Sequence, residues 1–137
     1  RFGDPEIQPI VCLMEDDIVP PLMACVEHDG GLDQERLRFL KGASVCVVMA
    51  SGGYPGHYEK GFPISGLDEA GSMDDVVVFH AGTSFNKEGQ CVTNGGRVLG
   101  VTGIGESMEE ARSKAYAAVE RISWEAVHYR RDIGAQS

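Results

Sequence analysis

The sequence changes character at Ala43, and this change limits most strongly how the chain can fold. Up to Gly42, apolar residues recur at helical intervals between prolines and paired glycines. From Ala43 onward, short runs rich in β-branched residues alternate with loops that contain glycine. Such runs are typical of strands. We therefore predict an α+β chain in which a helical segment over residues 1–40 precedes a small, mostly antiparallel sheet domain over residues 41–137.

Two helices are predicted in the first segment. A proline followed by a glutamate suits the first turn of a helix, which we expect over residues 6–14. The second helix would take Asp16 as its N-cap and end before the glycine pair at 30–31. Residues 32–42 are polar and ambiguous, and they leave room for one short strand.

The second segment is expected to hold several strands and one long helix. The strands are predicted over residues 45–50, 76–80, 91–93 and 97–102, with a hairpin turn over residues 86–89. Ser107 and Glu110 form a capping box, so the last helix is the clearest element. Its apolar residues recur at helical spacing: Met108, Ala111, Ala115, Ala118, Val119 and Ile122.

Composition excludes several classes of protein. Twelve basic and 21 acidic residues give a net charge of −9, which repels nucleic acid and anionic membranes. An anionic ligand therefore needs a local cluster of donors. The four cysteines are widely spaced in apolar stretches, which favours buried free thiols in a cytosolic protein. The chain opens on Arg1 and not on Met, so we expect it to be part of a longer protein.

Two clusters of residues could bind a ligand. Arg1, Asp4 and Glu6 could hold a carboxylate and an amine, although such short charged clusters are usually solvated surface. Arg97 follows Asn94 and two glycines, which indicates either an anion site or a type I′ turn.

Other motifs are less specific. His80 ends an apolar strand and could be a core residue or touch a ligand. The glycine-rich loop at residues 51–56 is more often structural, because it lacks the lysine and spacing of a nucleotide-binding loop. The histidines and cysteines lack the spacing of a zinc site.

Six segments together match one known family in order and spacing. They are RFGDPEIQP at residues 1–9, ASGGYPG at 50–56, EKG at 59–61, VFHAGT at 78–83, VTNGGRVLGVT at 92–102 and YRRDIG at 129–134. These segments resemble the phosphoribosylamine–glycine ligases. The resemblance implies an ATP-grasp enzyme of purine synthesis that joins glycine to 5-phosphoribosylamine through glycyl phosphate. Residues 1–40 would then be the C-terminal edge of the ATP-grasp core, and residues 41–137 the family's C-terminal domain.

The resemblance also implies roles for the two clusters. Arg1 would orient the glycine carboxylate or the acyl phosphate, while Asp4 and Glu6 would hold the amine or support Arg1. A second set of residues would contact the ribosyl phosphate or the glycyl group: Asn94, Gly95, Gly96 and Arg97. Weaker candidates for the same pocket are His80, Gly82 and Thr83.

Cofactors and partners follow from the same resemblance. The full-length enzyme would use ATP with Mg²⁺ or Mn²⁺, and would act in the cytoplasm on glycine and phosphoribosylamine. The metal ligands and the nucleotide lid would lie upstream, so the chain alone is expected to hold no metal and to be inactive. Two alternatives stay open: a related ATP-grasp purine enzyme that transfers formate or carbon dioxide, and a non-catalytic substrate-binding or interaction module.

Overall fold

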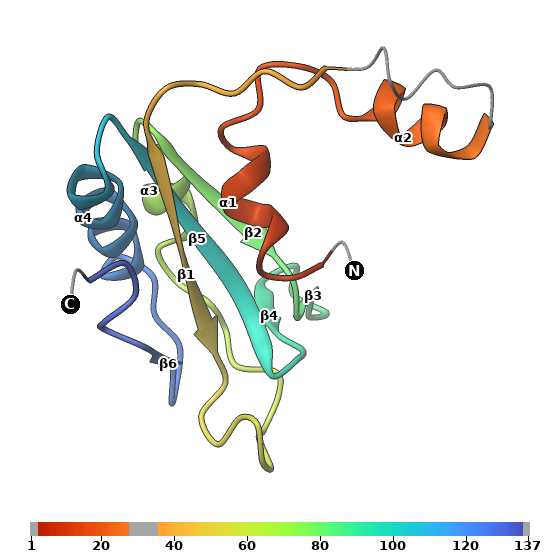
Figure 1. Cartoon of the computed structure of the whole chain (residues 1–137). Coiled ribbons are helices and arrows are strands. Elements are labelled where there is room, and N and C mark those ends of the chain that lie inside the picture. The colour runs from red at the N-terminus through yellow and green to blue at the C-terminus, as the bar shows by residue number, and fades with distance from the viewer. Residues whose placement is uncertain (1–2, 28–35, 136–137) are drawn as a thin grey trace.

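A four-stranded antiparallel sheet forms the centre of the computed structural model, which describes residues 3–27 and 36–135. Its strands are β1 (Ala43–Ala50), β2 (Val76–His80), β5 (Arg97–Gly105) and β6 (His128–Tyr129), in the order β2-β5-β1-β6. The long strand β5 pairs with β1 on one side and β2 on the other (Figure 1). The expected α+β fold with a mostly antiparallel sheet is confirmed.

One face of this sheet is covered by α4 (Met108–Val119) and the shorter α3 (Leu67–Gly71). Alternate side chains of β1 point to this face and join the buried alanines of α4 in the core. Gly103 lies under the helix backbone, since a Cβ at that position would be 2.3 Å from the Ala111 carbonyl oxygen. Small residues on both sides thus let α4 approach β5 closely.

This close approach predicts that Gly103→Ala lowers the free energy of unfolding by about 2 kcal/mol, because backbone atoms of α4 must move to admit a methyl group. Chemical denaturation would measure the change. Gly71→Ala is the matched control, since no heavy atom lies within 4 Å of its would-be Cβ. It should be neutral or stabilise by up to about 1 kcal/mol. Equal denaturation midpoints for the two variants would show that the close approach of α4 does not require a glycine at position 103.

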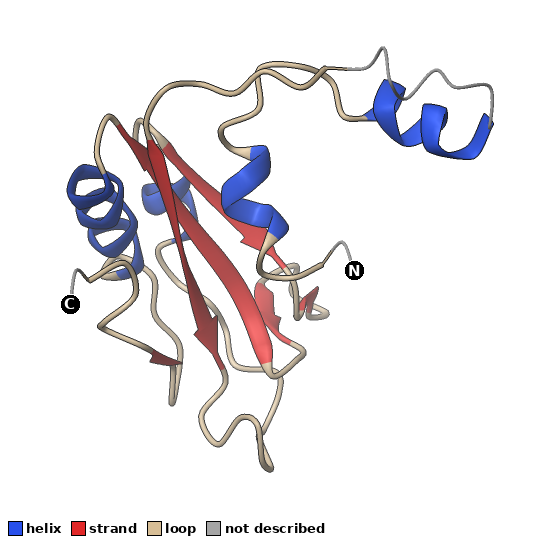
Figure 2. Cartoon of the chain, viewed as in Figure 1, coloured by secondary structure: helices blue, strands red, loops and turns tan. Residues whose placement is uncertain are grey.

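The opposite face of the sheet carries α1 (Ile7–Val11). This helix packs against β1 and β5, and the Ser44 hydroxyl donates to the Pro9 carbonyl at 2.6 Å. The following helix, α2 (Val19–Glu27), extends away from the sheet (Figure 2).

The second predicted helix is confirmed by α2, although its expected end before the glycines at 30–31 lies outside the described residues. Other expectations for the first segment need correction. The helix expected over residues 6–14 ends at Val11 and continues only as turns. Asp16 is wrong as an N-cap, because its carboxylate accepts the backbone N–H of Arg38 at 2.7 Å. Asp17 instead accepts the N–H of Val19. The strand expected within residues 32–42 is reduced to one isolated bridge at Phe39 in the part described.

The predicted hairpin turn and its returning strand β4 (Cys91–Thr93) are confirmed, but the partner of β4 is β3 (Thr83–Phe85), which was not predicted. Asn86 shapes its turn, because its side-chain oxygen accepts the N–H groups of Glu88 and Gln90. The hairpin forms a separate two-stranded sheet and does not continue β2.

The capping box of α4 is also confirmed. Ser107 Oγ accepts the Glu110 N–H at 3.2 Å, and the Glu110 carboxylate accepts the N–H of Glu106. The helix ends at Val119, three residues before the expected end, and Met108 is exposed at its start. Within residues 3–27 and 36–135, no helix is long and apolar enough to cross a membrane.

All four cysteines are free, as predicted, but they are less buried than expected. Cys25 is exposed on α2, and the other three are partly buried.

Candidate functional site

Arg97 and Asp4 come together although they lie far apart in the sequence. Arg97 Nε is 3.1 Å from Asp4 Oδ2, and both side chains are a little over one-third exposed. Asp4 precedes α1, and Arg97 is the first residue of β5. The structure therefore joins one residue from each of the two predicted clusters.

A β-bulge places Arg97 on the face of the sheet that carries α1. Met49 pairs with Leu99, but the next residue, Ala50, pairs with Arg97, so Val98 is the extra residue. Without the bulge, the alternation of β5 would give Arg97 the same face as Leu99, towards α4. The bulge is thus what allows the guanidinium to reach Asp4.

The Asp4–Arg97 pair stands at a cavity of about 370 Å³ on this face. Arg97 and residues from the helical segment, the sheet and the C-terminal region line it: Pro5, Cys46, Val48, Ala50, Tyr54, Arg97, His128, Tyr129, Arg130 and Ile133. Arg130 is already paired with Asp132, with Nε donating to Oδ1 at 2.9 Å. The contact between the two side chains joins Arg97 Nε and Asp4 Oδ2. The cavity can therefore offer guanidinium N–H groups to an anionic ligand.

Gln8 is a further member of this cluster, and the sequence reasoning missed it. It is the one buried residue of α1, with 8% of its surface exposed. Its amide nitrogen donates to Asp4 Oδ1 at 3.3 Å, and its amide oxygen accepts the Cys46 thiol at 3.2 Å. Asp4 lies before the helix that carries Gln8, so helical spacing gave no signal for this contact.

The segment from Asn94 to Gly96 leads into Arg97 and is fixed by hydrogen bonds to Ser51. The carbonyls of Gly95 and Gly96 accept the Oγ–H and N–H of Ser51, both at 2.8 Å. The alternative of a type I′ turn is wrong, because that turn needs positive φ and none of these residues has it. Tyr54 packs on Gly96, where a Cβ would be 2.1 Å from its ring.

The three weaker candidates do not line the cavity. His80 pairs with Leu99 across β2 and β5, so it lies on the face that carries α4. Its Nδ1 is 3.1 Å from Thr83 Oγ1. Gly82 packs against the backbone of Gly95, where a Cβ would be 2.7 Å from the Gly95 Cα. It therefore supports the segment before Arg97.

One described member of the first cluster, Glu6, does not line this cavity. Glu6 is exposed and lines a neighbouring hollow with Ser44 and Met108. Arg1 lies outside the described residues.

The described residues do not fit a metal site. They contain no group of three or more His, Cys, Asp and Glu side chains that could hold an ion. The Asp4 carboxylate is already engaged by Arg97 and Gln8.

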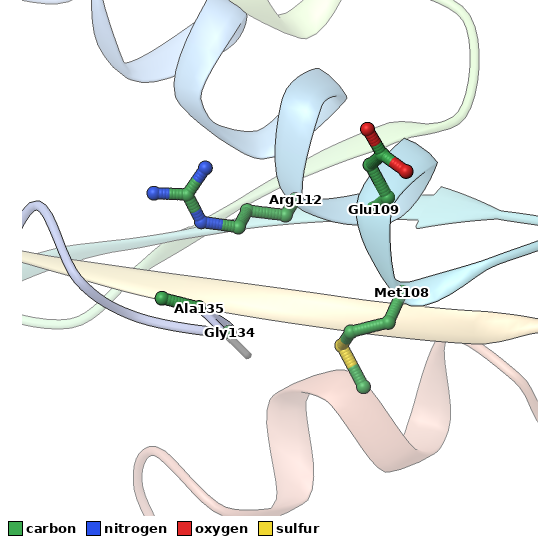
Figure 3. A pocket seen from close by; sticks show the side chains of 5 residues that line it. All are labelled: Met108, Glu109, Arg112, Gly134 and Ala135. Atoms are coloured by element: carbon green, nitrogen blue, oxygen red, sulfur yellow. The ribbon is translucent and has the colours of Figure 1, made fainter. Parts of the chain in front are cut away.

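A second hollow, of about 450 Å³, lies between α4 and the C-terminal residues (Figure 3). Its guanidinium belongs to Arg112, which donates to the carbonyls of Ile133 and Arg131 at 3.0 and 2.9 Å. Through these bonds, Arg112 anchors the C-terminal segment, so its guanidinium is already engaged. The cavity at Arg97 is therefore the better ligand site.

The Cys12 thiol is expected to lower stability at high pH. Burial and the charge of Cys46 raise the pKa of the Cys12 thiol from 9.0 to about 11. Between pH 9 and 11 the unfolded chain loses this proton while the folded chain keeps it, so stability falls as pH rises. Because the group is half exposed, we expect a loss of only roughly 1 kcal/mol. Urea unfolding under reducing conditions at pH 8 and 10.5 should show this loss, and Cys12→Ala should show less of it. Equal losses in both proteins would contradict the assignment.

Comparison with known families identifies what this chain is similar to. The family model described as Phosphoribosylglycinamide synthetase, C domain, matches residues 44–136. A phosphoribosylamine–glycine ligase from Synechocystis sp. is 52% identical over 135 residues, which cover 98% of this chain and 31% of the relative. The chloroplastic ligase of Arabidopsis thaliana is 48% identical over 98% of this chain and 25% of its own length.

A solved structure agrees with these sequence matches. The crystal structure of phosphoribosylamine–glycine ligase from Thermotoga maritima is similar with a TM-score of 0.74 at 38% identity. The match covers 95% of this chain and 30% of that one. The chain thus spans between a quarter and a third of the length of these relatives.

Proposed function

Because the chain belongs to the phosphoribosylglycinamide synthetase C-domain family, we propose that it is the C-terminal part of a ligase that joins glycine to 5-phosphoribosylamine. The observation that carries the proposal is the Arg97 guanidinium, which Asp4 holds at a cavity of about 370 Å³. In a protein of net charge −9, a local guanidinium is what an anionic substrate group needs. Arg97 would bind the ribosyl phosphate or the carboxylate end of the glycyl group.

The remaining parts of the reaction are assigned to the upstream protein. ATP with Mg²⁺ or Mn²⁺ would supply the phosphoryl group that activates the glycine carboxylate, and the ligands for both would lie outside this chain. The residues of this chain would bind and orient the acceptor and exclude water from it. The relatives named above are ligases that act with glycine, which favours glycine over formate or carbon dioxide. A cytoplasmic site of action stays a prediction.

Turnover by the full-length protein tests this proposal. ADP release from ATP should require both glycine and phosphoribosylamine, and replacing glycine by formate or bicarbonate should abolish it. ADP release that depends on formate or bicarbonate would favour a related ATP-grasp enzyme. A full-length protein that binds phosphoribosylamine without releasing ADP would favour the non-catalytic binding module.

The helical segment is proposed to belong to a neighbouring domain, the ATP-grasp core. The family model begins at residue 44, close to the boundary expected at residue 41. Four apolar side chains of α2 are exposed at helical spacing, each by 47% or more: Val19, Leu22, Met23 and Val26. Such a stripe on one face of a helix is typical of a packing surface.

We therefore expect the chain alone to bind a hydrophobic dye and to self-associate at high concentration. A variant with Leu22→Ser and Met23→Ser should lose most of both effects, while Phe85→Ser, which removes an exposed aromatic from β3, should not. Dye fluorescence and sedimentation would measure them. A monodisperse monomer that binds no dye would contradict the packing surface.

A further inference from the structure

The side chain of Gln8 is buried, and its amide contacts two polar groups. On one side the amide meets the Cys46 thiol of β1, and on the other side it meets the Asp4 carboxylate. Gly100 makes room for it, because a Cβ there would be 1.8 Å from Gln8 Oε1. The amide therefore occupies space that is available only because this position of β5 is a glycine.

The orientation of this amide is determined by Cys46. Burial raises the pKa of the Cys46 thiol, so the thiol keeps its proton and can donate to the amide oxygen. With its oxygen towards Cys46, the amide must turn its nitrogen towards Asp4. A reversed amide would place two acceptors, the amide oxygen and the carboxylate, against each other.

The two oxygens of Asp4 are then held from different sides. Oδ1 accepts from Gln8, and Oδ2 faces Arg97 Nε at 3.1 Å. A carboxylate fixed at both oxygens has a fixed plane, and this plane sets the direction of a guanidinium that pairs with it.

We infer that Gln8 is a positioning residue for substrate binding, which acts through Asp4 to fix how Arg97 presents its Nη groups to the cavity. The inference rests on the proposed function, in which Arg97 receives an anionic group of the substrate. It adds a residue that contacts no substrate itself.

Kinetics of the full-length ligase test this role. Gln8→Met keeps the length of the side chain but cannot donate to Asp4. We expect KM for phosphoribosylamine to rise about tenfold, which corresponds to the loss of one hydrogen bond to a charged group, while KM for ATP stays within twofold. Gln90→Met, at an exposed glutamine of the β3–β4 hairpin, is the matched control and should change neither value. An unchanged KM for phosphoribosylamine in Gln8→Met would overturn the inference.

NMR of this chain alone gives a second readout that does not depend on ligase activity. The exchange rate of the Arg97 Nε–H proton reports on its pairing with Asp4, and Arg97→Met identifies the signal. Gln8→Met should speed this exchange about tenfold. If exchange stays as slow in Gln8→Met as in the wild type, filling the space is sufficient. Gln8 would then be only a packing residue, and the inference would fail.

Cys46 provides the test if Gln8→Met does not fold. Cys46→Ser keeps a donor for the amide oxygen and should leave the Arg97 exchange slow, whereas Cys46→Ala should speed it. Equal exchange in both variants would overturn the inference. A wild-type ligase without activity would refute the proposed function, while the exchange rates would still decide the role of Gln8.

Discussion

The chain alone should release no ADP from ATP when glycine, phosphoribosylamine and Mg²⁺ are all supplied. The described residues lack a cluster of side chains that could hold a metal, and the chain spans at most about a third of its relatives. Without a metal and a closed nucleotide site, the charge of the transferring phosphoryl group is not neutralised and water is not excluded. The rate should therefore lie below about one-thousandth of that of the full-length protein, consistent with the size of metal and electrostatic contributions.

An ADP-release assay with the full-length protein as the positive control would measure this. Adding the upstream part as a separate chain should restore some turnover if the apolar face of α2 is where the two parts pack. Turnover by the chain alone, above background and dependent on glycine, would contradict both this expectation and the assignment of the metal and nucleotide sites to the upstream part.

Local signals in the sequence predicted the sheet domain well. The capping box at Ser107 and the apolar run of β1 are decided by neighbouring residues, and both were confirmed. The N-cap at Asp16 failed because its carboxylate is taken by Arg38, a residue 22 positions away that no local pattern indicates. The short elements α3, β3 and β6 were missed, since five, three and two residues are too few for a periodic signal.

The candidate site was only partly predictable for the same reason. The sequence singled out Asp4 and Arg97 as members of separate clusters, but their pairing depends on the fold. The bulge at Val98 decides the face on which Arg97 lies, and a bulge of this kind leaves no mark in an apolar strand sequence. Gln8 was missed because its importance comes from Gly100 and Cys46, two strand residues that meet α1 only after folding.

Arg97→Met should reduce kcat/KM of the full-length ligase for phosphoribosylamine by about 100-fold, or about 3 kcal/mol. Methionine keeps much of the length of the arginine stem but removes the charge and the guanidinium N–H groups. It also leaves Asp4 without its cation at the cavity, so that a carboxylate would repel an anionic substrate. KM for ATP should change less than twofold, since the nucleotide is proposed to bind in the upstream part.

Three further variants separate charge from structure at this position. Arg97→Lys should recover only part of the activity, because an ammonium cannot reproduce the planar guanidinium. Combining Arg97→Met with Asp4→Asn should be less damaging than the sum of the single changes, because it removes the unpaired carboxylate together with its partner. Arg121→Met, at an exposed arginine just after α4, is the matched control and should leave the kinetics unchanged. If Arg97→Met leaves kcat/KM for phosphoribosylamine within twofold of wild type, the guanidinium at this cavity does not bind the substrate, and the Asp4–Arg97 pair serves only to hold α1 against the sheet.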